Sequence, residues 1–255
     1  MPKLLQIAFQ FGDLSSKAGY VNHFAKRYIK SARASCCVVD HYYWHFGRVD
    51  IAGAKKLILK VDDPANPVAT EPRCDPHGIA YFPLSYDYER AEQLEGRDLK
   101  IQILDSVHKA VCGYCKFAGC DIAPAERAYE KVIEDDLRFG FYLEKGKAWK
   151  DPKSKLKAKL FIKFDWNELS IVAEMLSGRA LIGSAFMHST CPVVFDYRLF
   201  IHNPKWKAGA KFSVTTAKFP KFEKVVVSVS EKDCSNSQSA DTVAWGVQNP
   251  QSFNA

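Results

Sequence analysis

The amino-acid sequence predicts an α+β fold with mixed or antiparallel sheets, three main helices and a C-terminal half that is mostly β. Three observations support this prediction. Before residue 138, short strand patterns alternate with apolar residues at helical spacing, whereas beyond Phe139 a two-residue period dominates. The 255-residue chain is 47% apolar and 25% charged, which is typical of a globular protein.

The first sixty residues are expected to form three strands and one helix. Residues 3–12 place apolar side chains at alternate positions, which is typical of a half-buried strand. A helical pattern with a basic outer side follows from Ser16 to Arg33. The run SCCVVDH (35–41) predicts a second strand that leads into the aromatic cluster HYYWHF (41–46), and KKLILKV (55–61) predicts a third strand.

A loop and two helices are expected next. Five prolines between Asp62 and Pro83 predict a long loop over residues 62–85 without regular structure, because each proline removes a backbone donor. Asp98 begins an amphipathic helix that runs to about Ala118. Pro124 begins another helix, which runs to about Leu137.

Strands are expected from Phe139 onward. KLKAKLFIKFDW (155–166) alternates apolar and lysine residues, and it forms a hairpin with FGFYLEKGKAW (139–149). LSIVAEML (169–176) fits a strand or a helix, and a strand is preferred because turn-like sequences flank it. Further strands are predicted in VVFDYRLFI (193–201), AKFSVTTAKF (210–219) and KVVVSVS (224–230). The sequence therefore suggests an α/β part over 1–138, a β-rich part over 139–230 and a polar tail over 231–255.

The segment CGYCKFAGC (112–120) raises the question of a metal site, a redox site or packed core. Cys115 shares an apolar helical stripe with Val107 and Val111, which favours the core. A zinc site would need His108, Cys112, Cys115 and Cys120 to converge, and the chain has no second CxxC pair. A redox pair is expected at a helix N-terminus rather than deep in a helix. We therefore expect no metal ion and no cofactor, with this four-residue set as the metal alternative.

Two features suggest a binding surface. The formal net charge of +7 is concentrated in lysine-rich segments at 144–163 and 205–224. On a strand, the aromatic cluster would bury one set of side chains and present the other to a partner. The candidate partner-binding residues are Tyr42, Trp44, His45, Lys155, Lys157 and Lys159.

The lysine-rich strands have two interpretations. Rows of lysines neutralise phosphates, and Trp149, Trp166 and Trp206 would stack on bases, which predicts a nucleic-acid partner or a nuclease-like enzyme. Alternatively, lysines keep an exposed sheet face solvated and attract an acidic protein. The sequence carries no dinucleotide-binding, P-loop, nucleophile-elbow or zinc-protease motif, so we predict no catalytic residues and favour a protein that is not an enzyme.

The apolar run near the N-terminus is interrupted by Gln6 and Gln10, and it is too short and too polar for a signal peptide. No segment approaches the ~20 apolar residues that span a bilayer. These properties predict a cytoplasmic protein without membrane association.

Residues 97–164, RDLKIQILDSVHKAV through LRFGFYLEKGKAWKDPKSKLKAKLFIKF, place two helices before a lysine-rich hairpin. In this pattern the segment resembles uncharacterised bacterial proteins, and in overall character the chain is similar to immunity proteins of polymorphic toxin systems. The resemblance implies a cytoplasmic protein that inhibits a cognate toxin by binding it. It assigns no role to any single residue. The leading hypothesis is therefore a non-enzymatic inhibitor of a protein partner, and the alternative is the nucleic-acid-binding protein or nuclease-like enzyme.

Overall fold

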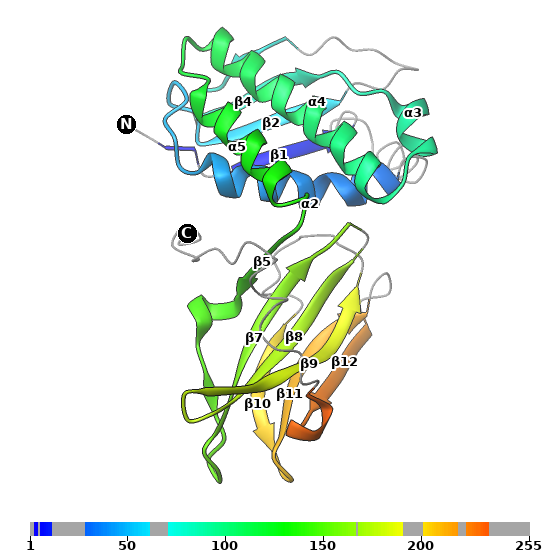
Figure 1. The fold of residues 1–255 in the computed structure, drawn as a ribbon. Helices are drawn as coiled ribbons and strands as arrows, with labels where there is room; N and C mark the ends of the chain where they lie inside the picture. Colours follow the sequence, from blue (N-terminus) through cyan, green and yellow to red (C-terminus); the bar gives the residue numbers. More distant parts are fainter. Residues whose placement is uncertain are drawn as a thin grey trace. The chain divides into compact units, whose positions relative to one another are not determined.

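The computed structural model describes residues 3–4, 6–11, 29–61, 71–166, 168–190, 201–218 and 223–234. The chain divides into two compact units, Met1–Leu137 and Arg138–Ala255. The N-terminal unit combines helices with a sheet, whereas the C-terminal unit is built mainly from strands (Figure 1). The predicted α+β class is therefore confirmed.

The sheet of the N-terminal unit has the strand order β1-β2-β4-β3. β1 (Gln6–Phe11), β2 (Lys56–Val61) and β4 (Ile79–Leu84) run parallel, and β3 (Arg73–Cys74) pairs antiparallel with β4. Alternate residues of β2 are fully buried, as the two-residue period requires. The strands predicted in residues 3–12 and 55–61 are confirmed.

β3 and β4 lie in the proline-rich region, so the prediction of a loop without regular structure is wrong for these residues. Their turn is closed by Asp75, whose Oδ1 accepts hydrogen bonds from the backbone N–H groups of His77 and Ile79, both at 2.9 Å. Among the described residues, β3 meets β4 only opposite Ala80 and Tyr81. Pro83 lies beyond this pairing, so its missing N–H costs no bond to β3. Residues 62–70 of the predicted loop lie outside the described residues.

Four described helices complete the N-terminal unit: α2 (Ile29–Phe46), α3 (Tyr88–Gln93), α4 (Gly96–Phe117) and α5 (Ala123–Glu134). α2 packs on β1, α4 packs on β4, and α5 packs on both α2 and α4 (Figure 1). α5 ends at Glu134 because Asp136 and Leu137 adopt positive φ angles of 51° and 59°. The helices predicted from Asp98 and Pro124 are confirmed, whereas residues 16–28 of the first predicted helix lie outside the described residues.

The strand predicted for residues 35–41, with its aromatic extension to Phe46, is wrong because these residues form α2. Valine and aromatic residues favour strands only when they fit a pleated, half-buried surface. In α2 they pack on β1, α4 and α5 instead, and they are buried on several sides of the helix. The buried apolar residues of this stretch are Cys37, Val38, Val39, Tyr42, Tyr43 and Phe46. Because Cys37, Val38 and Val39 are buried at consecutive positions, the sequence there shows a continuous apolar run, which fits a buried strand as well as a buried helix.

The C-terminal unit contains two antiparallel sheets. The larger has the order β5-β7-β8-β9, with β6 also paired to β7, and the smaller has the order β10-β11-β12. The bounds of the strands are β5 Phe139–Tyr142, β6 Trp149–Lys150, β7 Leu156–Phe164, β8 Leu169–Ser177, β9 Ala180–Thr190, β10 His202–Lys207, β11 Lys211–Lys218 and β12 Glu223–Val229. Short 3-10 helices occupy Leu143–Gly146 and Glu231–Asp233.

Most strands predicted for the C-terminal half are confirmed, and residues 169–176 are a strand rather than a helix. β9 and β10 were not predicted. Residues 193–200 of the strand predicted over 193–201, and residues 235–255 of the tail, lie outside the described residues. Between the two sheets, the rings of Trp149 and Trp206 pack on Phe212, with centroids 5.9 and 5.5 Å from it. Trp206 also donates from Nε1 to the Trp149 carbonyl oxygen at 2.9 Å.

Candidate functional site

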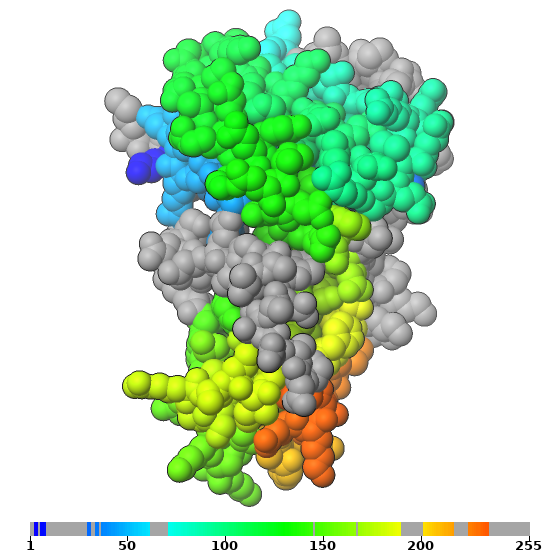
Figure 2. Space-filling model, viewed as in Figure 1, coloured from blue at the N-terminus to red at the C-terminus, as the bar shows by residue number. Residues whose placement is uncertain are grey.

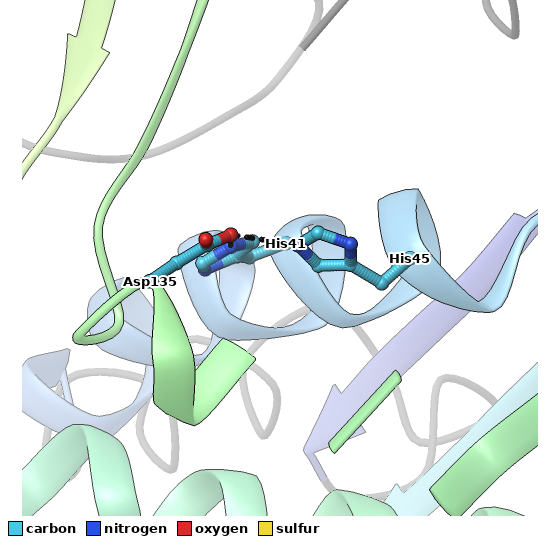
Figure 3. A group of neighbouring side chains, drawn as sticks. All are labelled: His41, His45 and Asp135. Atoms are coloured by element: carbon cyan, nitrogen blue, oxygen red, sulfur yellow. Dashed lines mark hydrogen bonds and ion pairs between the residues drawn. The ribbon is translucent and has the colours of Figure 1, made fainter. Parts of the chain in front are cut away.

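Two histidines and one aspartate converge where α2 meets the end of α5 (Figure 3). His41 and His45 lie one helical turn apart on α2, so their rings lie on the same side of the helix. Asp135 is the C-cap residue of α5, and its backbone N–H donates to the carbonyl oxygen of Lys131 at 2.9 Å. Asp135 Oδ2 lies 3.0 Å from His41 Nε2 and 2.8 Å from His45 Nε2. We call these three residues the His-Asp cluster.

The His-Asp cluster is largely buried. The side chains of His41, His45 and Asp135 are 2%, 9% and 16% exposed. Burial lowers the pKa of His41 to about 4, so this imidazole is neutral near pH 7. Burial alone would raise the pKa of Asp135, but hydrogen bonds from both imidazoles outweigh it and hold that pKa well below its ordinary value. An ionised carboxylate thus accepts two ring N–H groups inside the N-terminal unit.

The predicted aromatic partner-binding residues occupy different environments in α2. Tyr42 is fully buried, and its hydroxyl donates to the Ala125 carbonyl oxygen at 3.0 Å. The expectation that Tyr42 contacts a partner is therefore wrong, because the helix directs its ring into the core. His45 is a member of the His-Asp cluster. Trp44 is half-buried, and its role as a partner contact stays a prediction.

The cysteines of CGYCKFAGC do not form a metal cluster with other described residues. Cys115 is fully buried, as the apolar stripe of α4 predicts. Cys112 lies 3.7 Å from both ring nitrogens of His108, whereas Cys120 Sγ donates to the Ala118 carbonyl oxygen. Among the described side chains, the metal-ligating groups that converge are those of the His-Asp cluster, not His108, Cys112, Cys115 and Cys120.

We predict that the thiols differ sharply in reactivity. Cys74 is exposed, whereas burial raises the pKa of Cys115 to about 12 and removes its sulfur from solvent. At pH 8, iodoacetamide should modify Cys74 in the native protein and Cys115 only after unfolding, because the thiolate is the reactive form. Peptide mapping by mass spectrometry measures both sites in one sample. Rapid native labelling of Cys115 would contradict its place in the core.

The lysines of β7 lie on one face of the larger sheet. Across β7, β8 and β9, three rows of paired residues share this face: Lys157, Leu176 and Leu181; Lys159, Glu174 and Ser184; Phe161, Val172 and Phe186. Lys163 continues the same side of β7. Lys155 follows the same alternation at the exposed end of the sheet, where its carbonyl oxygen accepts from the N–H of Gly178 at 3.3 Å. We define the lysine face by Lys155, Lys157, Lys159, Lys163, Leu181 and Phe186.

The lysine face carries exposed apolar groups as well as charge. Phe186 is 61% exposed and Leu181 is 41% exposed. The turn between β8 and β9 protrudes from the C-terminal unit (Figure 2), and residues 177–181 are exposed. Lys157 donates from Nζ to the Gly178 carbonyl oxygen at 3.0 Å, so its charge is held at this turn. The exposed Arg179 adds a further positive charge there.

The lysines differ in how far they are free to meet a partner. Lys159 is paired in register with the buried Glu174, and its Nζ lies 5.5 Å from the centre of the Tyr142 ring. The Tyr142 hydroxyl donates to Glu174 Oε1 at 2.7 Å. Burial is the larger cause that raises the pKa of Tyr142, and this hydrogen bond raises it further. Lys155 is exposed. The charges best placed for a partner are therefore those of Lys155 and Lys157, rather than that of Lys159.

Comparison with protein-family models, with curated proteins and with solved structures gave no match. None of the described helices combines the length and the apolar character needed to cross a membrane.

Sequence patterns left several site residues unidentified. The His41-x-x-x-His45 spacing indicates adjacent ligands only if the segment is helical, and its strand-like composition concealed this signal. Asp135 is 94 residues from His41, so no local motif joins them. Leu181 and Phe186 belong to β9, which the sequence pattern did not indicate.

Proposed function

We propose that this chain is a non-enzymatic, cytoplasmic binding protein that holds an acidic protein partner on the lysine face. The observation that supports this proposal is the exposure of Phe186 and Leu181 on the same sheet face as the lysines. Protein interfaces commonly centre on a large apolar anchor, while charges at the rim guide association. Phe186 has the size and exposure of such an anchor, and Lys155 and Lys157 supply the charges.

The positions of the tryptophans favour a protein partner over a nucleic acid. Single-stranded nucleic acids are held by aromatic rings that stack on bases beside a basic groove. Trp149 pairs with Ala158, which points away from the lysine face, and Trp149 and Trp206 pack on Phe212. The Arg138 guanidinium lies over the Trp166 ring, with its Cζ atom 4.5 Å from the ring centroid. The lysine face therefore lacks Trp149 and Trp206 as stacking platforms, and the Trp166 ring already contacts Arg138.

The overall similarity of the chain to immunity proteins of polymorphic toxin systems suggests the class of partner, and residues 97–164 resemble uncharacterised bacterial proteins with a lysine-rich hairpin. Immunity proteins of polymorphic toxin systems act by occupying a surface of a cognate toxin. The lysines of the lysine face lie within residues 97–164, whereas Leu181 and Phe186 come from β9. On this proposal the partner is a toxin domain with an acidic rim around an apolar pocket.

We predict that two variants of the lysine face, one single and one double substitution, weaken partner binding in different ways. Phe186→Ser should accelerate dissociation and cost at least about 2 kcal/mol, because an anchor contributes most of its energy once bound. Lys155→Glu with Lys157→Glu should slow association and reduce its salt dependence. The partner would be captured from the native host on immobilised protein and identified by mass spectrometry. Surface plasmon resonance with the purified partner then gives both rate constants.

The matched control is Lys205→Glu with Lys207→Glu, which changes the net charge equally on exposed positions of β10. This control should leave both rate constants near the wild-type values. Equal effects of the two double substitutions would show that net charge alone drives association. Tight binding of random oligonucleotides, lost steeply with added salt, would instead favour the nucleic-acid alternative.

A further inference from the structure

The His-Asp cluster has the donor set and the spacing of a metal site. Its three candidate ligand atoms lie within 4.8 Å of one another. In a tetrahedral zinc site, Zn–N and Zn–O bonds of about 2.0–2.2 Å place neighbouring ligand atoms roughly 3.3–3.6 Å apart. The observed Nε2–Oδ2 distances of 3.0 and 2.8 Å are those of hydrogen bonds. The carboxylate would have to withdraw by only about half an ångström for an ion to replace the two ring protons.

The backbone fixes two of the three ligands relative to each other before any ion binds. His41 and His45 lie on consecutive turns of one helix, with ring centroids 5.2 Å apart and ring planes inclined by 44°. Asp135 extends from the last turn of α5, which packs directly on α2. Such preorganisation lowers the entropic cost of assembling a coordination shell. Two imidazoles and one carboxylate leave one position for water in a four-coordinate ion.

We propose that His41, His45 and Asp135 bind a divalent transition metal ion, with Zn²⁺ as the representative ion. Both imidazoles coordinate through Nε2, and Asp135 coordinates through its carboxylate. Coordination needs the lone pair of each Nε2, so the Nε2 proton that His41 and His45 each donate to Asp135 moves to the Nδ1 of the same ring. Asp135 is the most exposed of the three side chains, and it gives the ion and its water a route from solvent.

The positive charge of the buried Lys100 of α4 disfavours the binding of a cation at the His-Asp cluster. Lys100 is 1% exposed, and its charge acts on His41. A metal ion would add a second positive charge beside that of Lys100, and the ionised Asp135 must balance it. The carboxylate charge is therefore essential for metal binding but not for the hydrogen bonds. A purely structural hydrogen-bonded cluster, which ties α2 to α5 without an ion, would not need that charge. Asp135→Asn separates the two roles, because an amide oxygen still accepts a hydrogen bond.

The test is a titration of the full chain with Zn²⁺, using a chromophoric chelator as competitor. We expect one equivalent to bind to the wild-type protein. Asp135→Asn and His45→Gln should each lower the Zn²⁺ affinity by at least about 100-fold. Loss of a residue that only supports a ligand can already cost roughly 100-fold, and these two residues are the ligands themselves. His108→Gln is the matched control, because His108 lies on a neighbouring helix beside Cys112, and it should bind as the wild type does. Circular dichroism verifies that each variant is folded.

A second measurement does not depend on any variant. Co²⁺ bound to nitrogen and oxygen ligands should give visible ligand-field bands without sulfur-to-cobalt charge transfer. The proposal is overturned if the wild-type protein binds no Zn²⁺ or Co²⁺ at stoichiometric concentrations. It is equally overturned if Asp135→Asn and His45→Gln retain wild-type affinity, or if a charge-transfer band places the ion on cysteine thiolates.

Discussion

Replacing Tyr42 with alanine is expected to destabilise the N-terminal unit by about 3–5 kcal/mol, the range for removing a large aromatic ring from a packed core. The Tyr42 ring is fully buried and stacks on Phe46, with centroids 6.2 Å apart. A domain is commonly stable by only about 5–15 kcal/mol, so the loss is a large fraction of the total. Urea denaturation of the full chain, followed by circular dichroism, measures the shift of the unfolding midpoint.

Tyr42→Phe separates the ring from the hydroxyl. The hydroxyl donates to the Ala125 carbonyl oxygen at 3.0 Å and lies 3.1 Å from His108 Nδ1. Because its single proton is given to Ala125, the geometry assigns the second bond to His108 Nδ1–H as donor. Tyr42→Phe leaves that donor without its present acceptor and should cost about 1–2 kcal/mol.

Phe117→Ala is the control for the Tyr42 series, because Phe117 also lies on a helix of the N-terminal unit but is 57% exposed. Its removal should change stability by no more than about 0.5 kcal/mol. If Tyr42→Ala unfolds at the wild-type urea concentration, the ring does not stabilise the core. A folded Tyr42→Ala variant that loses a partner would restore the surface role that the sequence first suggested.

Strands with one recurring period were predictable from the sequence. β2 alternates buried and half-buried residues, and β7 alternates lysines with apolar residues except at Phe161. Both patterns follow from side chains that point to opposite faces of a sheet. α4 was predictable for the corresponding reason, because one side of the helix is buried and the other is exposed.

Elements were missed where packing or register overrode the local pattern. α2 contacts β1, α4 and α5, and its consecutive buried residues Cys37, Val38 and Val39 form an apolar run that fits a strand as well as a helix. β9 departs from simple alternation because its pairing with β8 shifts register twice, between Ile171 and Val172 and between Met175 and Leu176. Each shift reverses which residues share a face, and a two-residue period does not reveal it.

The candidate sites required these missed elements. The His-Asp cluster needs α2 to be a helix and brings together residues that are 90 and 94 positions apart. The apolar part of the lysine face comes from β9, whereas its lysines come from β7 and from Lys155 directly before it, in a strand that the sequence did indicate. Spacing along the chain therefore identified the charge of the binding surface but not its anchor.

Gly140→Ala is expected to destabilise the C-terminal unit by about 2–3 kcal/mol, near the upper part of the range for overpacking. A Cβ at this position would lie 2.6 Å from Phe161 Cζ and 2.9 Å from the Ile162 carbonyl oxygen. The Phe161 ring is fully buried and is held by the Tyr142 ring, with centroids 4.9 Å apart. Neither the ring nor the backbone oxygen can move without disturbing the pairing of β5 with β7.

Two comparisons test the cause of this effect. Gly113→Ala on α4 also brings a Cβ within 2.8 Å of a ring, that of Phe82, but Phe82 is only half-buried. Alanine also gains about 1 kcal/mol of helix propensity there, so Gly113→Ala should cost clearly less than Gly140→Ala. Adding Phe161→Leu to Gly140→Ala should recover part of the loss, because leucine lacks the ring atoms nearest the new Cβ. Urea denaturation followed by tryptophan fluorescence gives the coupling between the two substitutions. Simple additivity would show that Phe161 is not what excludes a side chain at Gly140.

Because Phe161 lies between Lys159 and Lys163 on the lysine face, a ring displaced by Gly140→Ala should also weaken partner binding.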